Sequence, residues 1–283
     1  VYKRQIYKPH RKRDNKNMSN KKMILHFTLL TFIIAYSTSG LLIILGQYGY
    51  KVYNWVNTLQ QFIMNIPFAI YILSPAIASF AILKKYNKIT DIKEWLKTVF
   101  YAKNSLYAYL YVIAILTLYF LIHMFVTGNT KIALPFYTFF LSLPGCLMIG
   151  GLEESGWMYI LQPEFNKKYG YILSSIYTGI IWFFWHIPLF FIPGTNHGDG
   201  LINFWMFAVQ VMSFRFLIGA IYKISGKGCI FMCVLFHTMF NAASPLFGTM
   251  TMTWLGTIIA NIIIVLISIV TVIIHNQRHE QFI

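Results

Sequence analysis

Charge, and acidic charge above all, is scarce in this sequence. Its 283 residues include 8 Asp and Glu, and charged residues make up 11% of the chain while hydrophobic residues make up 57%. A soluble domain ordinarily carries about 25% charged residues, so the composition excludes the soluble classes. Cysteine is scarce too. Its three copies lie in apolar segments, which excludes a disulfide framework.

The sequence contains long hydrophobic segments without any charged residue. Neither Ile24–Tyr50 nor Val52–Leu83 contains Lys, Arg, Asp or Glu. Because one span needs about 20 apolar residues, the pattern predicts an all-α, polytopic membrane protein with about eight transmembrane helices and an intramembrane active site. The predicted spans are 24–46, 64–83, 105–126, 134–162, 172–192, 201–222, 228–247 and 252–274.

The basic residues follow the predicted membrane topology. With the N-terminus in the cytoplasm, cytoplasmic segments hold 20 Lys and Arg and external loops hold Lys51 and Lys131. This distribution follows the positive-inside rule. The net charge of +15 therefore indicates topology and contact with membrane lipid rather than nucleic-acid binding. Richness in Ile, Lys, Asn and Tyr favours a bacterial cell membrane.

Three parts are expected along the chain: a basic cytoplasmic tail over 1–22, a single integral membrane domain over 23–275 and a short C-terminal tail over 276–283. The first 17 residues are either a native anchor or partly non-native sequence. Residues 84–103 alternate lysines with apolar residues at helical spacing, which predicts an interfacial amphipathic helix.

Two adjacent acids, Glu153 and Glu154, lie inside the fourth predicted span. Insertion scales place a single charged residue at a span centre at roughly 2.5–3.5 kcal/mol, so an intramembrane acid indicates a functional site. Neighbours on a helix point about 100° apart. One carboxylate is therefore expected to face the site while the other orients it or binds a neighbouring span. For Arg215, in the sixth predicted span, we expect either an acidic partner or snorkelling toward the interface.

Two further spans supply polar partners. His186 follows Trp182 by one turn and precedes Pro188, which leaves the Phe184 carbonyl without its helical donor. In the seventh span, His237 and Asn241 share one helical face.

This inventory suits hydrolysis by either of two mechanisms. Glu153 or Glu154 can serve as general base toward water, with His186, His237 and Asn241 assisting and stabilising an oxyanion. Alternatively, Glu153, His186 and His237 bind a divalent metal such as zinc, which activates the water. Cys229 and Cys233 share the face of His237, so a thiolate metal site is a further alternative to small buried cysteines.

The three elements resemble the motifs of the CAAX-protease and bacteriocin-processing family of intramembrane proteases, often called CPBP or Abi. Its pattern is EExxxR, then FxxxH, then HxxxN or HxxxB, on separate spans. Residues 153–154, 182–186 and 237–241 match in this order. There are two departures from the pattern: Met158 stands at the arginine position, and Trp182 replaces the phenylalanine.

The resemblance implies an eight-helix core, a site open toward the cytoplasmic side and endopeptidase activity with Glu153 as the base. Eukaryotic relatives cleave prenylated C-terminal CAAX sequences, whereas bacterial members are tied to bacteriocin maturation, self-immunity or peptide processing. The expected substrate is therefore a membrane-associated peptide of prenyl-like or bacteriocin type. Two alternatives stay open: a non-catalytic peptide-binding or bacteriocin-immunity protein, for which Met158 leaves room, and a proton-coupled transporter.

Overall fold

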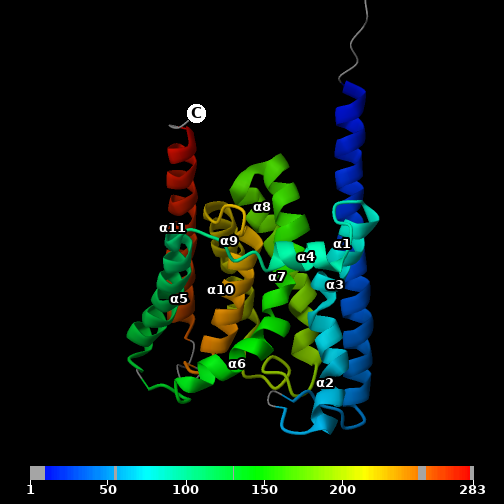
Figure 1. Cartoon of the computed structure of the whole chain (residues 1–283). Helices are drawn as coiled ribbons and strands as arrows, with labels where there is room; N and C mark the ends of the chain where they lie inside the picture. Colours follow the sequence, from blue (N-terminus) through cyan, green and yellow to red (C-terminus); the bar gives the residue numbers. More distant parts are fainter. Residues whose placement is uncertain (1–9, 54–55, 130, 248–252, 281–283) are drawn as a thin grey trace, which may run out of the picture.

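The fold is a bundle of helices, seen here in a computed structural model that describes residues 10–53, 56–129, 131–247 and 253–280. Within these ranges every regular element is a helix, which confirms the predicted all-α class. Long helices α1 (His10–Gly46) and α11 (Trp254–Glu280) stand at opposite edges, and the remaining helices pack between them (Figure 1). Helix α1 begins inside the predicted tail, whose first nine residues lie outside the described ranges.

The apolar helices make this an integral membrane protein, although the count of eight spans is not confirmed. Among the described residues, five helical stretches are long and apolar enough to cross a membrane, or six if the bent pair α2 (Leu59–Ile72) and α3 (Ser74–Lys85) forms one span. That pair is bent by 55°. At 15 residues, α10 (Cys229–Ala243) is shorter than the predicted seventh span.

The fourth and fifth predicted spans fall within one largely helical stretch of 55 residues, Tyr137–Phe191. It folds back on itself in α8 (Gln162–His186), where Gly170 has φ 73° and ψ 179°. The side chains of Gln162 and Ser175 are hydrogen-bonded at 3.2 Å, whereas 13 residues of straight helix would separate them by about 20 Å. The two predicted spans are therefore the two arms of one hairpin. Hydropathy predicted them as separate helices.

The segment carrying the glutamate pair is less regular than the single helix predicted over 134–162. It comprises α6 (Tyr137–Met148), the 3₁₀ turn η1 (Gly151–Glu153), the short α7 (Glu154–Gly156) and the π-helical η2 (Trp157–Leu161). Ile149 and Gly150 separate α6 from η1, and Gly150 has φ 123°, which a glycine adopts readily. π-Helical turns occur frequently at functional sites.

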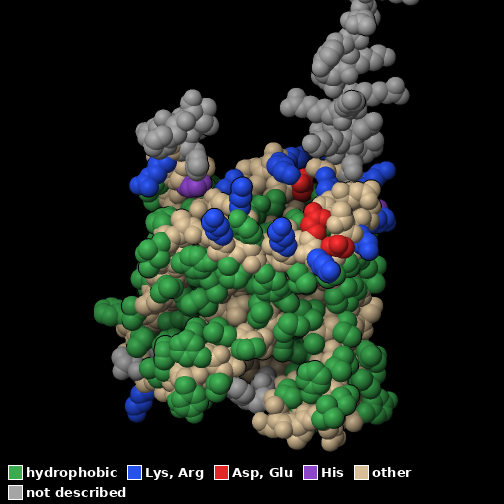
Figure 2. Space-filling model, in the orientation of Figure 1, with side chains coloured by type: hydrophobic (Ala, Val, Ile, Leu, Met, Phe, Trp, Pro, Cys, Tyr) green, Lys and Arg blue, Asp and Glu red, His purple; other side chains and the backbone are tan. Residues whose placement is uncertain are grey.

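Basic side chains gather at one end of the molecule, above a broad hydrophobic band (Figure 2). The predicted amphipathic helix lies at this end as α4 (Ile92–Val99). Trp95 is buried and donates a hydrogen bond to Ser79 of α3 at 3.0 Å, while Ile92 and Leu96 are exposed. One face of α4 is thus fixed to the bundle, and its exposed apolar side chains suit a membrane interface.

The remaining long helices complete the bundle around the hairpin. Helix α5 (Leu106–Thr127) packs on α11, and α9 (Phe204–Ile224) packs on α8, α10 and α11. Helix α10 in turn contacts α6, η1 and α7. The three motif-bearing segments therefore meet in the middle of the bundle, and 3₁₀ turn η3 (Ile187–Phe191) closes the second arm of the hairpin.

Candidate active site

The two glutamates lie in the interior of the bundle and face different partners. Glu153 ends η1 and is 3% exposed, while Glu154 begins α7 and is fully buried. Glu153 Oε2 accepts a hydrogen bond from Trp182 Nε1 at 2.9 Å. Its Oε1 accepts none from the residues that the structure describes. One oxygen of this carboxylate is therefore fixed and the other is free to bind water or substrate.

Glu154 is the centre of an ion-pair network. Arg215 Nη1 donates to Oε2 at 3.0 Å and Arg215 Nη2 donates to Oε1 at 2.5 Å. His237 Nδ1 lies 3.0 Å from the same Oε1. A bidentate guanidinium–carboxylate pair is among the strongest hydrogen-bonded contacts in proteins. Of the two expectations for Arg215, the structure shows the acidic partner and not snorkelling.

The two histidines are oriented through their Nδ1 atoms. His186 Nδ1 lies 2.8 Å from the Trp182 carbonyl. A carbonyl oxygen accepts and does not donate, so Nδ1 carries the proton and Nε2 presents its lone pair. An ionised Glu154 fixes His237 in the same tautomer. Both imidazoles are nearly buried, at 6% and 8% exposure.

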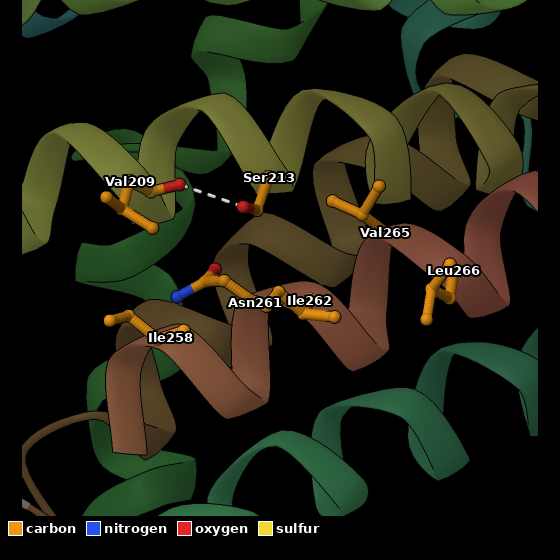
Figure 3. Close-up of a pocket in the computed structure, with 7 residues that line it drawn as sticks. All are labelled: Val209, Ser213, Ile258, Asn261, Ile262, Val265 and Leu266. Carbon is orange, nitrogen blue, oxygen red and sulfur yellow. Dashed lines mark hydrogen bonds between the residues drawn. The ribbon is translucent and has the colours of Figure 1, made fainter. Parts of the chain in front are cut away.

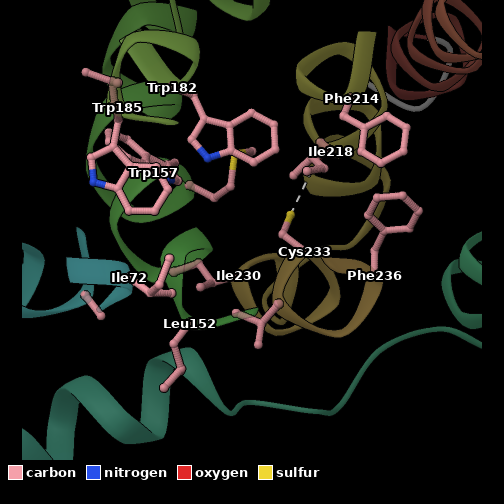
Figure 4. Close-up of a cluster of buried hydrophobic side chains, with 14 of the residues drawn as sticks. Ile72, Leu152, Trp157, Trp182, Trp185, Phe214, Ile218, Ile230, Cys233 and Phe236 are labelled. Carbon is pink, nitrogen blue, oxygen red and sulfur yellow. Dashed lines mark hydrogen bonds between the residues drawn. The ribbon is translucent and has the colours of Figure 1, made fainter. Parts of the chain in front are cut away.

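Trp182 joins these groups. Its ring meets His186 edge-on with centroids 4.7 Å apart, meets His237 at 5.7 Å, and lies 3.7 Å from the Arg215 guanidinium carbon. Figure 4 shows Trp182 among buried side chains from several helices. The indole therefore packs against both imidazoles while its N–H holds Glu153.

Asn241 marks the side on which the site approaches the surface. It lies one turn after His237, is partly exposed, and donates to the Ile149 carbonyl at 3.2 Å. Ile149 is itself 38% exposed. The Phe184 carbonyl released by Pro188 is satisfied from another helix, because Tyr36 donates to it at 2.7 Å.

Neither predicted metal site takes shape among the described residues. No three His, Cys, Asp or Glu side chains there lie close enough to hold an ion, including Glu153, His186 and His237. Cys233 is buried and its Sγ lies 3.5 Å from the Ile218 carbonyl (Figure 4), as expected of a small buried thiol. The mechanism below uses no metal.

A separate groove of about 240 Å³ lies between α9 and α11 (Figure 3). Its polar groups bond largely within their own helices: Ser213 donates to the Val209 carbonyl at 2.9 Å, and Asn261 donates to the Thr257 carbonyl at 2.8 Å. None of the predicted site residues lines it.

The sequence did not predict one contact of the site and left another undecided. The indole N–H of Trp182 bonding Glu153 could have been suspected from the exchange of phenylalanine for tryptophan. The pairing of Arg215 with Glu154 had a signal in the cost of an unpaired intramembrane arginine, but no spacing rule links positions 61 residues apart.

Comparison with known proteins agrees with the motifs. No curated protein matches the chain. Residues 135–243 match the model of the family described as Rce1-like, Type II CAAX prenyl endopeptidase, and this range contains all three motifs. Over these residues the chain is thus similar to the CAAX-protease family, which supports the resemblance predicted from the motifs.

Proposed function

We propose that this chain is an endopeptidase in which Glu153 activates water within the membrane domain. The observation that carries the proposal is the state of Glu153, a buried carboxylate with one oxygen held by Trp182 and the other without a partner among the described residues. A general base needs a free oxygen within reach of water.

The residues support a balanced hydrolytic sequence. Glu153 takes a proton from water as the hydroxyl oxygen adds to the scissile carbonyl carbon. Negative charge then develops on the carbonyl oxygen, where the amide of Asn241, turned away from Ile149, can donate a hydrogen bond. Glu153 returns the proton to the leaving nitrogen as the C–N bond breaks. His186 Nε2 can accept a hydrogen bond from the water and orient it.

Glu154 and His237 are proposed to act as a pair. The carboxylate holds the imidazole by Nδ1, which leaves Nε2 toward the substrate. When Nε2 carries a proton, it can donate a hydrogen bond to the oxyanion. A metal-dependent mechanism stays a separate hypothesis, for which loss of activity in a chelator and its return with zinc is the test.

The proposed substrate is a peptide associated with the membrane, either prenyl-like or of bacteriocin type, and membrane lipid is the expected surrounding partner. We further propose a bacterial cell membrane with the N-terminus in the cytoplasm, and no nucleic-acid partner. The gathering of Lys and Arg at one end (Figure 2) supports this orientation.

The test compares host cells that make the wild type, Glu153→Gln or Glu94→Gln at equal membrane levels. Glu94 lies on the exposed side of α4 and is the matched control. Mass spectrometry maps peptide termini of membrane and secreted proteins. New termini with the wild type and Glu94→Gln that are absent with Glu153→Gln support the proposal. Identical new termini with all three favour the non-catalytic alternative.

A further inference from the structure

Arg215 lies outside the three motifs but at the centre of the site. It stands on α9, is fully buried, and reaches Glu154 with two guanidinium nitrogens. The same guanidinium lies against the ring of Trp182. One side chain thus contacts the partner of His237 and the residue that holds Glu153.

The place where the motif has arginine is taken by a side chain that cannot pair with a carboxylate. Met158 lies in η2, four residues after Glu154, and is fully buried. Residues four apart on a helix are neighbours on one face. A cation at position 158 would therefore begin close to Glu154, but this chain supplies the cation from α9.

We propose that Arg215 is a positioning residue that performs from α9 the charge pairing left vacant at Met158. The inference rests on the proposed function. Its fork fixes both oxygens of Glu154, and this carboxylate then holds His237 by Nδ1. Contact with the Trp182 ring further restricts the position of the guanidinium. Arg215 thereby sets the orientation of the groups around the reacting water without touching the substrate.

The exchange also accounts for the second departure from the motif. Tryptophan is the best ring for a cation held at close range, and its N–H supplies a donor to Glu153 that phenylalanine lacks. Arg215 therefore connects the two departures from the motif. Its guanidinium stacks on the Trp182 ring, and the Trp182 N–H holds Glu153.

The decisive experiment exchanges the two residues. Arg215→Met removes the pair, and Arg215→Met with Met158→Arg restores an arginine while preserving composition and charge. Arg215→Lys keeps the charge but not the bidentate fork. Purified proteins in detergent are compared for kcat, KM and melting temperature with a peptide cleaved by the wild type, and ¹⁵N-histidine spectra report the tautomer of His237.

The expected result is a fall in kcat of about 100-fold or more in Arg215→Met, by loss of orientation of charged groups, with KM changed less than threefold. The exchanged variant should regain at least tenfold, and Arg215→Lys should fall between wild type and Arg215→Met. The spectra should show the Nδ1–H tautomer of His237 in the wild type and a mixture in Arg215→Met.

Three outcomes would overturn the inference. One is wild-type kcat in a folded Arg215→Met. Another is recovery of the melting temperature without recovery of kcat in the exchanged variant, which would make Arg215 a structural residue. If Arg215→Met does not fold, a folded Arg215→Lys with unchanged kcat and tautomer would refute it. Failure of the proposed function looks different, because the wild type itself would then cleave no peptide while the tautomer readout still reports on Arg215.

Discussion

Replacing each adjacent glutamate by glutamine should separate chemistry from stability. Glu153→Gln keeps an oxygen that can accept from Trp182, and it removes a carboxylate that forms no ion pair with the residues that the structure describes. Glu154→Gln removes the carboxylate with which the buried guanidinium of Arg215 forms its ion pair. Breaking a buried ion pair by removing one partner destabilises a protein by about 3–5 kcal/mol.

The expected shift can be read as a melting temperature. For chains of this size about 1 kcal/mol corresponds to roughly 2–4 °C, so Glu154→Gln should melt roughly 6–20 °C below the wild type. Glu153→Gln should melt close to the wild type. Its kcat should fall by about 10²–10⁴-fold, the ordinary effect of losing a general base.

A thiol-reactive dye provides the stability assay, because Cys233 is fully buried and becomes reactive on unfolding. Activity is measured on the same detergent preparations. Equal melting temperatures for the two glutamine variants would contradict the assignment of the ion pair to Glu154. A normally active Glu153→Gln would refute its role as the base, whatever the stability.

Other predictions address single contacts. Trp182→Phe removes the hydrogen bond to a carboxylate but keeps the ring, so kcat should fall about 10–150-fold for a loss of about 1.5–3 kcal/mol; unchanged kcat would show that the N–H does not orient Glu153. Gly156→Ala places a methyl group 2.6 Å from a backbone oxygen of α3, so the melting temperature should fall. Gly145→Ala is the control, because open space surrounds Gly145. Equal melting temperatures of the two variants would contradict the close packing at Gly156. Burial in the loop after η3 lowers the pKa of His197 from 6.5 to about 4. The unfolded chain therefore binds a proton between these values that the folded chain does not, so stability should fall as pH drops from about 6.5 to 4, and this slope should be smaller in His197→Leu.

Hydropathy was sufficient for the membrane class and the helical fold but not for the number of spans. An apolar run shows which residues can lie in lipid. It does not show where the backbone bends or reverses its direction. The reversal at Gly170 depends on a backbone conformation and on contacts such as Gln162 with Ser175. Helix α10 has 15 residues and contacts several neighbouring elements, among them α6, η1 and α7.

The sequence was sufficient to nominate the residues of the candidate site. Intramembrane acids and histidines are expensive in lipid, so their presence in three separate segments marked them together. The i, i+4 spacing also placed His237 and Asn241 on one face. Local spacing does not identify partners on other helices, however. The different contacts of Glu153 and Glu154 could therefore not be predicted from their adjacent positions in the sequence.

The sequence by itself determined that the chain is a helical membrane protein with an intramembrane polar site, because transfer of charge into lipid is costly wherever it occurs. Tertiary structure alone decided that Arg215 pairs with Glu154 and that Trp182 holds Glu153. Those contacts join residues 61 and 29 positions apart. They exist because helix packing brings the donors within about 3 Å of the carboxylates, a distance that no periodicity along the chain encodes.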